Sequence, residues 1–228
     1  MSTAASVLPP PLRDGDRLTR DEFLRRWDAM PDLKHAELLD GVVYLPSPVS
    51  TPHGRHHSHL DNWLGNYAAR TPGCDATIDT TWIMGERDVP QPDIALMILP
   101  EYRGQSKMEG NLSSGAPEFI VEVAFSSRQR DLAIKTRLYQ RAGVREYVTA
   151  LVKEKRIAWR HLIDGEFQTL DADSDGIYRS RVFPGLWLDS AAFWRLDRAA
   201  LLTCLDQGTA TPGHSAFVRE LAARRVDS

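Results

Sequence analysis

Two acidic residues lie in apolar segments that are typical of neighbouring buried strands. Asp93 opens the run 94–99, and Glu122 lies inside the run 119–124, between two valines. An ionised carboxylate in a buried strand costs several kcal/mol unless it pairs with a cation or binds a metal. Oxygen ligands of this kind suit Mg²⁺ or Mn²⁺ better than zinc. We therefore expect both residues to be metal ligands; the alternative is that one or both pair with arginines at a strand end.

A lysine in the next expected helix, residues 131–142, is the natural partner of these carboxylates. At 100° per residue, Lys135 falls within the apolar arc of that helix and not on its solvent face. An inward lysine beside two carboxylates can neutralise them, or stabilise an oxyanion and position a water. Alternatively, its stem packs while its ammonium reaches solvent.

Basic residues are concentrated around the same helix. The stretch 128–145 carries six basic residues and one acidic residue, although the formal charge of the whole chain is −3. Arg130, Arg137 and Arg141 cluster on one flank and are the candidate DNA-binding residues, because a local positive surface can follow a phosphate backbone. The alternative is an ordinary solvated helix face.

Several motifs connect these residues to a known family. They are the hairpin segment 37–41, Pro92-Asp93, Glu122-Val123, Asp131-x-x-x-Lys135-x-x-x-Tyr139, Ala142-Gly-Val-x-Glu-Tyr147 and Pro184-Gly-Leu186. In this order and spacing, over roughly residues 19–190, the chain resembles the Uma family of predicted restriction-endonuclease-like proteins. That family belongs to the PD-(D/E)XK nuclease superfamily.

The resemblance implies both a fold and a reaction. The fold class is α/β (α+β), with a restriction-endonuclease-like core in which a mixed central sheet is flanked by helices. The reaction is hydrolysis of DNA phosphodiester bonds with Mg²⁺ or Mn²⁺ as cofactor. The implied catalytic residues are Lys135, Glu122, Asp93 and Glu37, the metal ligands are Asp93 and Glu122, and His53 and Tyr139 are accessory candidates.

The chain departs from the superfamily pattern at one position. The usual active-site lysine stands two residues after the glutamate, where this chain has Ala124. The resemblance therefore assigns the lysine role to Lys135, which requires the following helix to bring its ammonium back to the carboxylates.

The remaining elements fit one domain between short end segments. We expect a flexible tail over 1–15, where three successive prolines occur, a PD-(D/E)XK nuclease-like domain over 16–206, and a C-terminal helix or tail over 207–228. Asp40-Gly41 predicts a tight hairpin turn. The apolar spacing from His57 to Ala68 predicts a helix over 53–70. The other expected elements are helices 19–31 and 190–205, strands 77–84, 93–99, 118–125, 145–152, 156–163, 166–170 and 184–188, and a loop over 100–115.

Composition limits the classes of protein. A global basic footprint is absent, so a nucleic-acid surface must be a local patch. Two cysteines, Cys74 and Cys204, make neither a disulfide framework nor a four-thiolate zinc site, and we predict a cytoplasmic protein. No apolar run reaches about 18 residues, so no membrane partner is expected.

The sequence also allows other interpretations of several residues. His53 and His57 share a helix face as zinc ligands can, but no third ligand is evident, and a polar helix start is the simpler interpretation. Trp187, Phe193 and Trp194 form either a dimer surface or ordinary core. A homodimer is natural for an enzyme that must cut both strands of DNA. The competing function is a DNA-binding or protein-interaction module that uses a nuclease fold without cutting.

Overall fold

The computed structural model describes residues 8–46, 48–125 and 129–226, with backbone alone for residues 129–132. Its centre is a six-stranded sheet in the order β11-β10-β9-β8-β5-β3. The antiparallel neighbours β3, β5 and β8 are followed by β9, which lies parallel to β8, and then by antiparallel β10 and β11. The bounds are β3 (Cys74–Ile78), β5 (Ile94–Ile98), β8 (Phe119–Ala124), β9 (Glu146–Leu151), β10 (Arg156–Ile163) and β11 (Glu166–Leu170).

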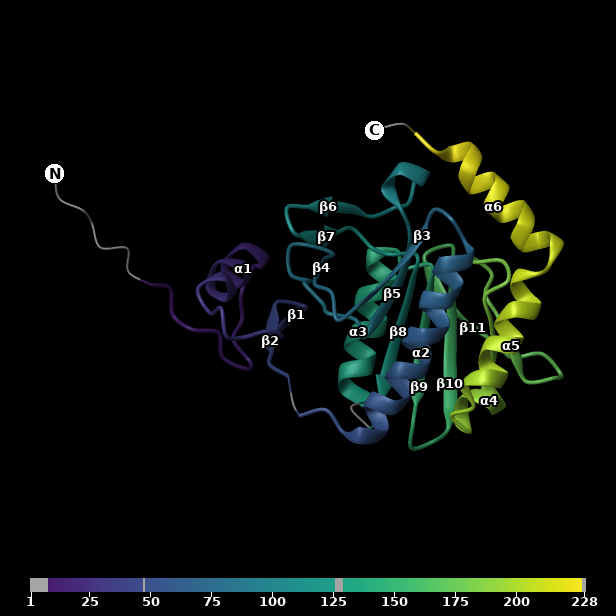
Figure 1. The fold of residues 1–228 in the computed structure, drawn as a ribbon. Helices are drawn as coiled ribbons and strands as arrows, with labels where there is room; N and C mark the ends of the chain where they lie inside the picture. The colour runs from purple at the N-terminus through teal and green to yellow at the C-terminus, as the bar shows by residue number, and fades with distance from the viewer. Residues whose placement is uncertain (1–7, 47, 126–128, 227–228) are drawn as a thin grey trace.

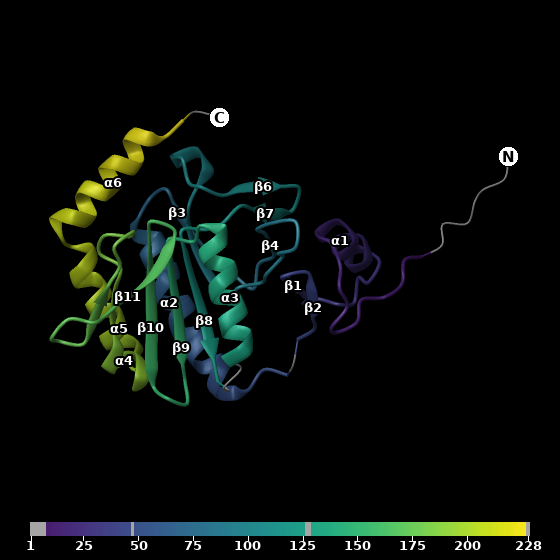
Figure 2. The same ribbon diagram turned by 180° about the vertical axis from the view of Figure 1, so that it is seen from behind.

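Helices cover both faces of this sheet, which confirms the mixed α/β class expected from the sequence. Figure 1 shows α2 (Thr51–Arg70) in front of the sheet, with α4 (Ser190–Trp194) and α5 (Arg198–Thr209) beside it. Figure 2 shows α3 (Gln129–Ala142) on the opposite face, where it forms the crossover between parallel β8 and β9.

Alternation along β8 decides which residues meet which helix. Phe119, Val121 and Val123 join the large core cluster that includes Trp63 of α2. Ile120 instead joins the cluster that contains Leu138 and Tyr139 of α3. Because side chains alternate between sheet faces, Glu122 must point towards α3.

The N-terminal residues form a small lobe at the side of the sheet (Figure 1). It contains α1 (Arg20–Asp28), β1 (Glu37–Leu39) and β2 (Val42–Tyr44), packed around its own apolar cluster. Asp40 and Gly41 have φ of 53° and 77°, the positive values that the tight turn predicted from this dipeptide requires. Of the expected tail, residues 1–7 lie outside the described residues, while Leu12 is buried in the lobe.

The expectation of a single strand over 77–84 is wrong. The chain turns at Asp79, whose φ is 48°, and β4 (Trp82–Ile83) leaves the main sheet. It joins a three-stranded sheet in the order β4-β7-β6. The region expected to be a loop supplies its other strands, β6 (Lys107–Glu109) and β7 (Leu112–Ser114), after a short 3₁₀ helix, Pro100–Tyr102.

The single helix expected over 190–205 is also wrong. Leu196 has a φ of 57°, which an α-helix cannot accommodate, so the segment divides into α4 and α5. A further helix, α6 (Pro212–Arg224), follows, and β12 (Ile177–Arg179) pairs with β13 (Trp187–Asp189). Phe193 is fully buried, as expected if it belongs to the core and not to a dimer surface. Among the described residues, no helix combines the length and apolarity needed to cross a membrane.

Candidate active site

Asp93 and Glu122 lie at the adjoining ends of two neighbouring strands. β5 and β8 pair antiparallel with Ile94 opposite Val121, so the register extended by one residue sets Asp93 opposite Glu122. Directly opposed residues share one face of a sheet, with Cβ atoms about 4.5–5.5 Å apart. The backbone N–H of Val123 donates to Asp93 Oδ2 at 2.6 Å, which fixes the aspartate beside the end of β8.

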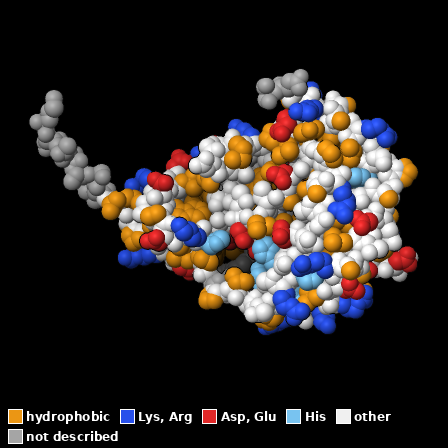
Figure 3. All heavy atoms as spheres, in the orientation of Figure 1, with side chains coloured by type: hydrophobic (Ala, Val, Ile, Leu, Met, Phe, Trp, Pro, Cys, Tyr) orange, Lys and Arg blue, Asp and Glu red, His pale blue; other side chains and the backbone are white. Residues whose placement is uncertain are grey.

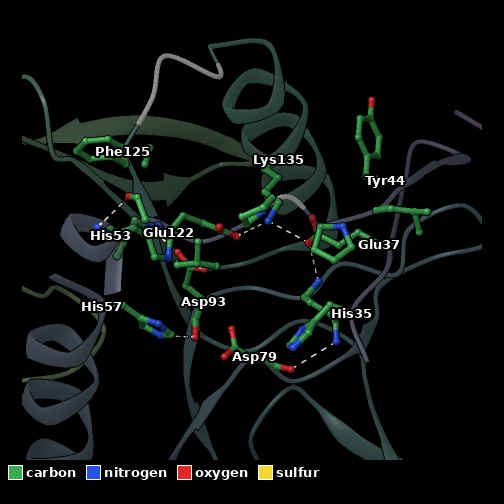
Figure 4. Close-up of a pocket in the computed structure, with 18 of the residues that line it drawn as sticks. His35, Glu37, Tyr44, His53, His57, Asp79, Asp93, Glu122, Phe125 and Lys135 are labelled. Carbon is green, nitrogen blue, oxygen red and sulfur yellow. Dashed lines mark hydrogen bonds and ion pairs between the residues drawn. The ribbon is translucent and has the colours of Figure 1, made fainter. Parts of the chain in front are cut away.

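Lys135 reaches these carboxylates from α3. Its ammonium nitrogen Nζ lies 2.9 Å from Glu122 Oε1 and 3.0 Å from Glu37 Oε1, and Figure 4 shows it between the two acids. One helical turn further on, the Tyr139 hydroxyl donates to Glu122 Oε1 at 2.7 Å. The side chain that the apolar arc predicts to point inward therefore lies at the acidic pair, and Tyr139 lies beside it.

Glu37 comes from the N-terminal lobe and is held by a residue that the sequence interpretation missed. The backbone N–H of Gln91 donates to Glu37 Oε1 at 2.7 Å. The Gln91 side chain accepts from the Ala36 N–H at 3.1 Å and donates to Thr81 Oγ1 at 3.0 Å. Its sequence signal is a lone amide between two prolines, directly before the Pro-Asp motif. Gln91 thus attaches the hairpin to the sheet next to Asp93.

Two histidines of α2 complete the boundary of the site on its other side. His53 Nε2 lies 3.8 Å from Asp93 Oδ1, and a ring nitrogen of His57 lies 3.1 Å from the backbone oxygen of Asp93. His57 is half-buried, and His56 is the buried histidine of this turn, packed against Phe193. His53 and His57, which are less buried, line the cavity.

These groups open into one cavity of about 530 Å³ between the N-terminal hairpin and the sheet. Figure 3 shows the corresponding hollow, with acidic and histidine side chains at its edge. The polar floor contains Glu37, Asp93, Glu122 and Lys135, and apolar walls include Tyr44 and Phe125. A charged floor with apolar walls is the usual composition of a ligand site.

Burial and mutual charge set the protonation of the buried groups. Burial raises the pKa of Glu122 above its ordinary value, the Lys135 charge opposes this rise, and the charges of Asp93 and Glu37 add to it. Burial lowers the pKa of Lys135, but Glu122, Glu37 and Asp93 together raise it well above its ordinary value. Burial and the Glu122 charge raise the pKa of Tyr139. Lys135 therefore remains a cation and Tyr139 a neutral hydrogen-bond donor.

The donor atoms fit a hard divalent cation. Lys135 and Tyr139 both bind Oε1 of Glu122, and the described residues place no hydrogen-bond donor on its Oε2. Mg²⁺ commonly takes one or two carboxylates and fills its other positions with water and phosphate oxygens. Within the described residues, no group of three or more His, Cys, Asp or Glu side chains is arranged to hold a metal. Paired carboxylate oxygens are ligands of the type that Mg²⁺ and Mn²⁺ accept.

The three arginines expected to bind DNA have different surroundings. Arg141 Nη2 donates to Asp88 Oδ2 at 2.7 Å, and Asp88 also accepts from the Asp40 N–H at 2.9 Å. Arg141 therefore connects α3 to the turn of the N-terminal hairpin. Arg137 is exposed, and the side chain of Arg130 lies outside the described residues.

The protein is thus a mixed α/β fold in which an acidic pair near the ends of two central strands meets a lysine from α3. Residues 20–191 match the model of the Uma2 family, described as "Putative restriction endonuclease", and the chain belongs to that family. This confirms the family resemblance carried by the motifs and supports a nuclease-like role.

A solved structure shares the fold. It is described as a "putative nuclease belonging to DUF820" from Anabaena variabilis ATCC 29413. The TM-score is 0.62 and the sequence identity 15%, over 78% of this chain and 98% of that chain. No curated protein matches this chain in sequence.

Proposed function

We propose that this protein is an endonuclease that hydrolyses DNA phosphodiester bonds with Mg²⁺ or Mn²⁺. The observation that carries the proposal is the meeting of Glu37, Asp93, Glu122 and Lys135 in one cavity, since these residues come from β1, the residue before β5, β8 and α3. A structural ion pair requires one cation and one anion, whereas here three carboxylates surround a single lysine. The surplus of negative charge, with Glu122 buried and Glu37 and Asp93 half-buried, favours a bound cation.

Each side chain has a role that follows from its position. Asp93 and Glu122 would hold the divalent ion, with the Val123 carbonyl as a further ligand. Bound there, such an ion lowers the pKa of water and neutralises charge that develops on a phosphate. Lys135 supplies a fixed positive charge for the phosphate oxygens.

The surrounding residues position these groups. Glu37 and Tyr139 restrict Lys135 and Glu122 to one geometry through bonds of 3.0 Å and 2.7 Å. His53, beside Asp93, can accept or donate a proton at the open side of the cavity. We also propose a homodimer, because cleavage of both strands of a duplex needs two such sites.

The test is nicking of supercoiled plasmid in the presence of Mg²⁺, Mn²⁺ or EDTA. The natural protein is expected to convert the plasmid to open-circular and linear forms only with the metals. Asp93→Asn, Glu122→Gln and Lys135→Met should each abolish conversion, whereas Lys107→Met, an exposed lysine of β6, should not. Conversion that survives the three site substitutions would refute the assignment. Intact plasmid with every metal, together with DNA binding, would favour the non-cutting module instead.

A further inference from the structure

Exposed cations gather at one end of the molecule, next to the candidate active site. The start of α2, the turn between β9 and β10, and α4 lie at the same end in both ribbon views (Figures 1 and 2). Figure 3 shows Lys and Arg side chains concentrated along that lower edge, with histidines between them and the hollow. We call this group the lower basic patch: Arg55, Lys153, Lys155, Arg156, Arg195 and Arg198, all exposed.

Contacts join this patch to the cavity. Lys153 Nζ lies over the ring of Phe125, 5.4 Å from its centroid, and Phe125 lines the cavity wall. At the other side of the patch, Arg198 Nη2 donates to Ser58 Oγ of α2 at 3.2 Å. Ser58 directly follows His57, which also lines the cavity.

The charge balance of the patch is strongly positive. Two acidic residues, Glu154 and Asp197, interrupt the segments that carry the six cations. Asp197 accepts from the Ala200 N–H as the N-cap of α5, so part of its charge is already compensated. No ion pair is found for the six cations among the described residues, so their charge is available to an external anion.

The acidic charge of the cavity explains why DNA binding needs a positive surface beside it. The cavity floor carries more acidic than basic groups, and this repels a polyanion until a cation binds. A phosphate backbone approaching the cavity needs positive charge at the border of the site. The described arginines of α3 offer less, because Arg141 is already bound to Asp88.

We infer that the lower basic patch binds the phosphate backbone of the substrate DNA and directs the scissile phosphate into the cavity past Phe125. This inference rests on the proposed nuclease function for its substrate, but the binding can be measured without cleavage. Since each phosphate contact releases counterions, the salt dependence of binding reports the number of phosphates bound.

The test is fluorescence anisotropy of a labelled DNA duplex with the full chain in EDTA, repeated over a range of salt concentrations. Two charge-removing variants carry the inference: Lys153→Ala/Lys155→Ala/Arg156→Ala and Arg55→Ala/Arg195→Ala/Arg198→Ala. Each should weaken binding at least about tenfold and reduce the slope of log affinity against log salt by about 0.9 for every phosphate that is no longer neutralised. The charge-keeping variant Lys153→Arg/Lys155→Arg/Arg156→Lys should bind nearly as the natural protein does.

Matched controls separate this surface from general charge. Lys107→Ala/Arg219→Ala removes two exposed cations from β6 and α6, at the opposite end of the molecule, and should leave affinity and slope unchanged. The inference is overturned if the patch variants bind DNA as tightly as the natural protein does. It is also overturned if Arg137→Ala alone weakens binding as much as the patch variants do, or if the natural protein binds no DNA. If DNA binds through the patch but the plasmid stays intact in Mg²⁺, the nuclease proposal is refuted and the inference that the patch binds DNA holds.

Discussion

The ammonium of Lys135 lies 2.9 Å from Glu122 Oε1, and both side chains are almost removed from solvent, with the residues 9% and 7% exposed. Glu37 and Asp93 add two more carboxylates around the same cation. Charge at this point therefore affects both the stability of the fold and the chemistry of the site. Substitutions there are informative because the two effects can be measured separately.

Loss of the Lys135 charge should lower both the stability of the fold and the rate of cleavage. Lys135→Met keeps much of the side-chain volume but leaves Glu122 without its cation, so the free energy of unfolding should fall by about 3 kcal/mol. The rate of plasmid cleavage should fall by about 100-fold or more, as when one electrostatic stabiliser is removed. Denaturant unfolding and nicking rates measure the two effects. The double variant Glu122→Gln/Lys135→Met should recover stability without activity; if it does not, uncompensated charge is the wrong explanation.

Divalent metal should stabilise the natural protein through the two carboxylates. At a concentration about 100 times the dissociation constant, a ligand that binds the native state alone adds about 2.7 kcal/mol to the free energy of unfolding. Mg²⁺ and Mn²⁺ should therefore raise the melting temperature of the natural protein and not that of Asp93→Asn or Glu122→Gln. In EDTA, Glu122→Gln should be no less stable than the natural protein near pH 7, because burial disfavours the charged form of Glu122 and raises its pKa. Equal metal-induced shifts in all three proteins would contradict the assigned ligands.

A second buried acid should make stability depend on pH. Burial raises the pKa of Glu146 to about 7, against hydrogen bonds from Ser180 and Arg181. A carboxyl whose pKa is raised on folding contributes stability that is complete below its unfolded value and is lost as pH rises through the folded one. The free energy of unfolding should thus lose about 3 kcal/mol from this group between about pH 4 and pH 8. Glu146→Gln should have a correspondingly flatter profile in denaturant titrations, and parallel profiles would show that Glu146 does not titrate in this range.

The ion pair between Arg141 and Asp88 should contribute to the attachment of the hairpin. Asp88 is buried and accepts from both Arg141 and the Asp40 backbone. Arg141→Gln should therefore lower the free energy of unfolding by about 1 kcal/mol, since it removes a charge-assisted hydrogen bond at a half-exposed site. A double-mutant cycle with Asp88→Asn measures the coupling directly. A coupling energy of zero would leave Arg141 as a free surface cation.

Local patterns were sufficient for several parts of the site. The valines around Glu122 indicate a buried strand, and strict alternation then turns the carboxylate towards one sheet face. The helical spacing around Lys135 predicts an inward ammonium in the same way. Asp40-Gly41 predicts its own turn because both residues tolerate positive φ. In each case the relevant interactions are between residues close in the chain.

Other features depend on interactions that no local pattern encodes. Strand 77–84 divides because Trp82 and Ile83 pair with β7, about 30 residues further on. Gln91 acquires its role from Ala36 and Glu37, 55 and 54 residues earlier. Arg141 is directed to Asp88, 53 residues earlier, and Asp88 also accepts from the Asp40 N–H of the N-terminal hairpin. The expected helix over 190–205 breaks where Leu196 adopts positive φ and its carbonyl meets His59.

The sequence by itself determined which residues can carry the chemistry and on which kind of element each stands, because periodicity and turn propensity act over a few residues. Only the tertiary structure decided that Glu37, Asp93, Glu122 and Lys135 meet. Their meeting requires the register that sets Asp93 opposite Glu122, the crossover that returns α3 over the same sheet face, and the docking of the N-terminal hairpin. All three depend on packing between segments that are distant in sequence, and close packing of the whole core fixes that arrangement.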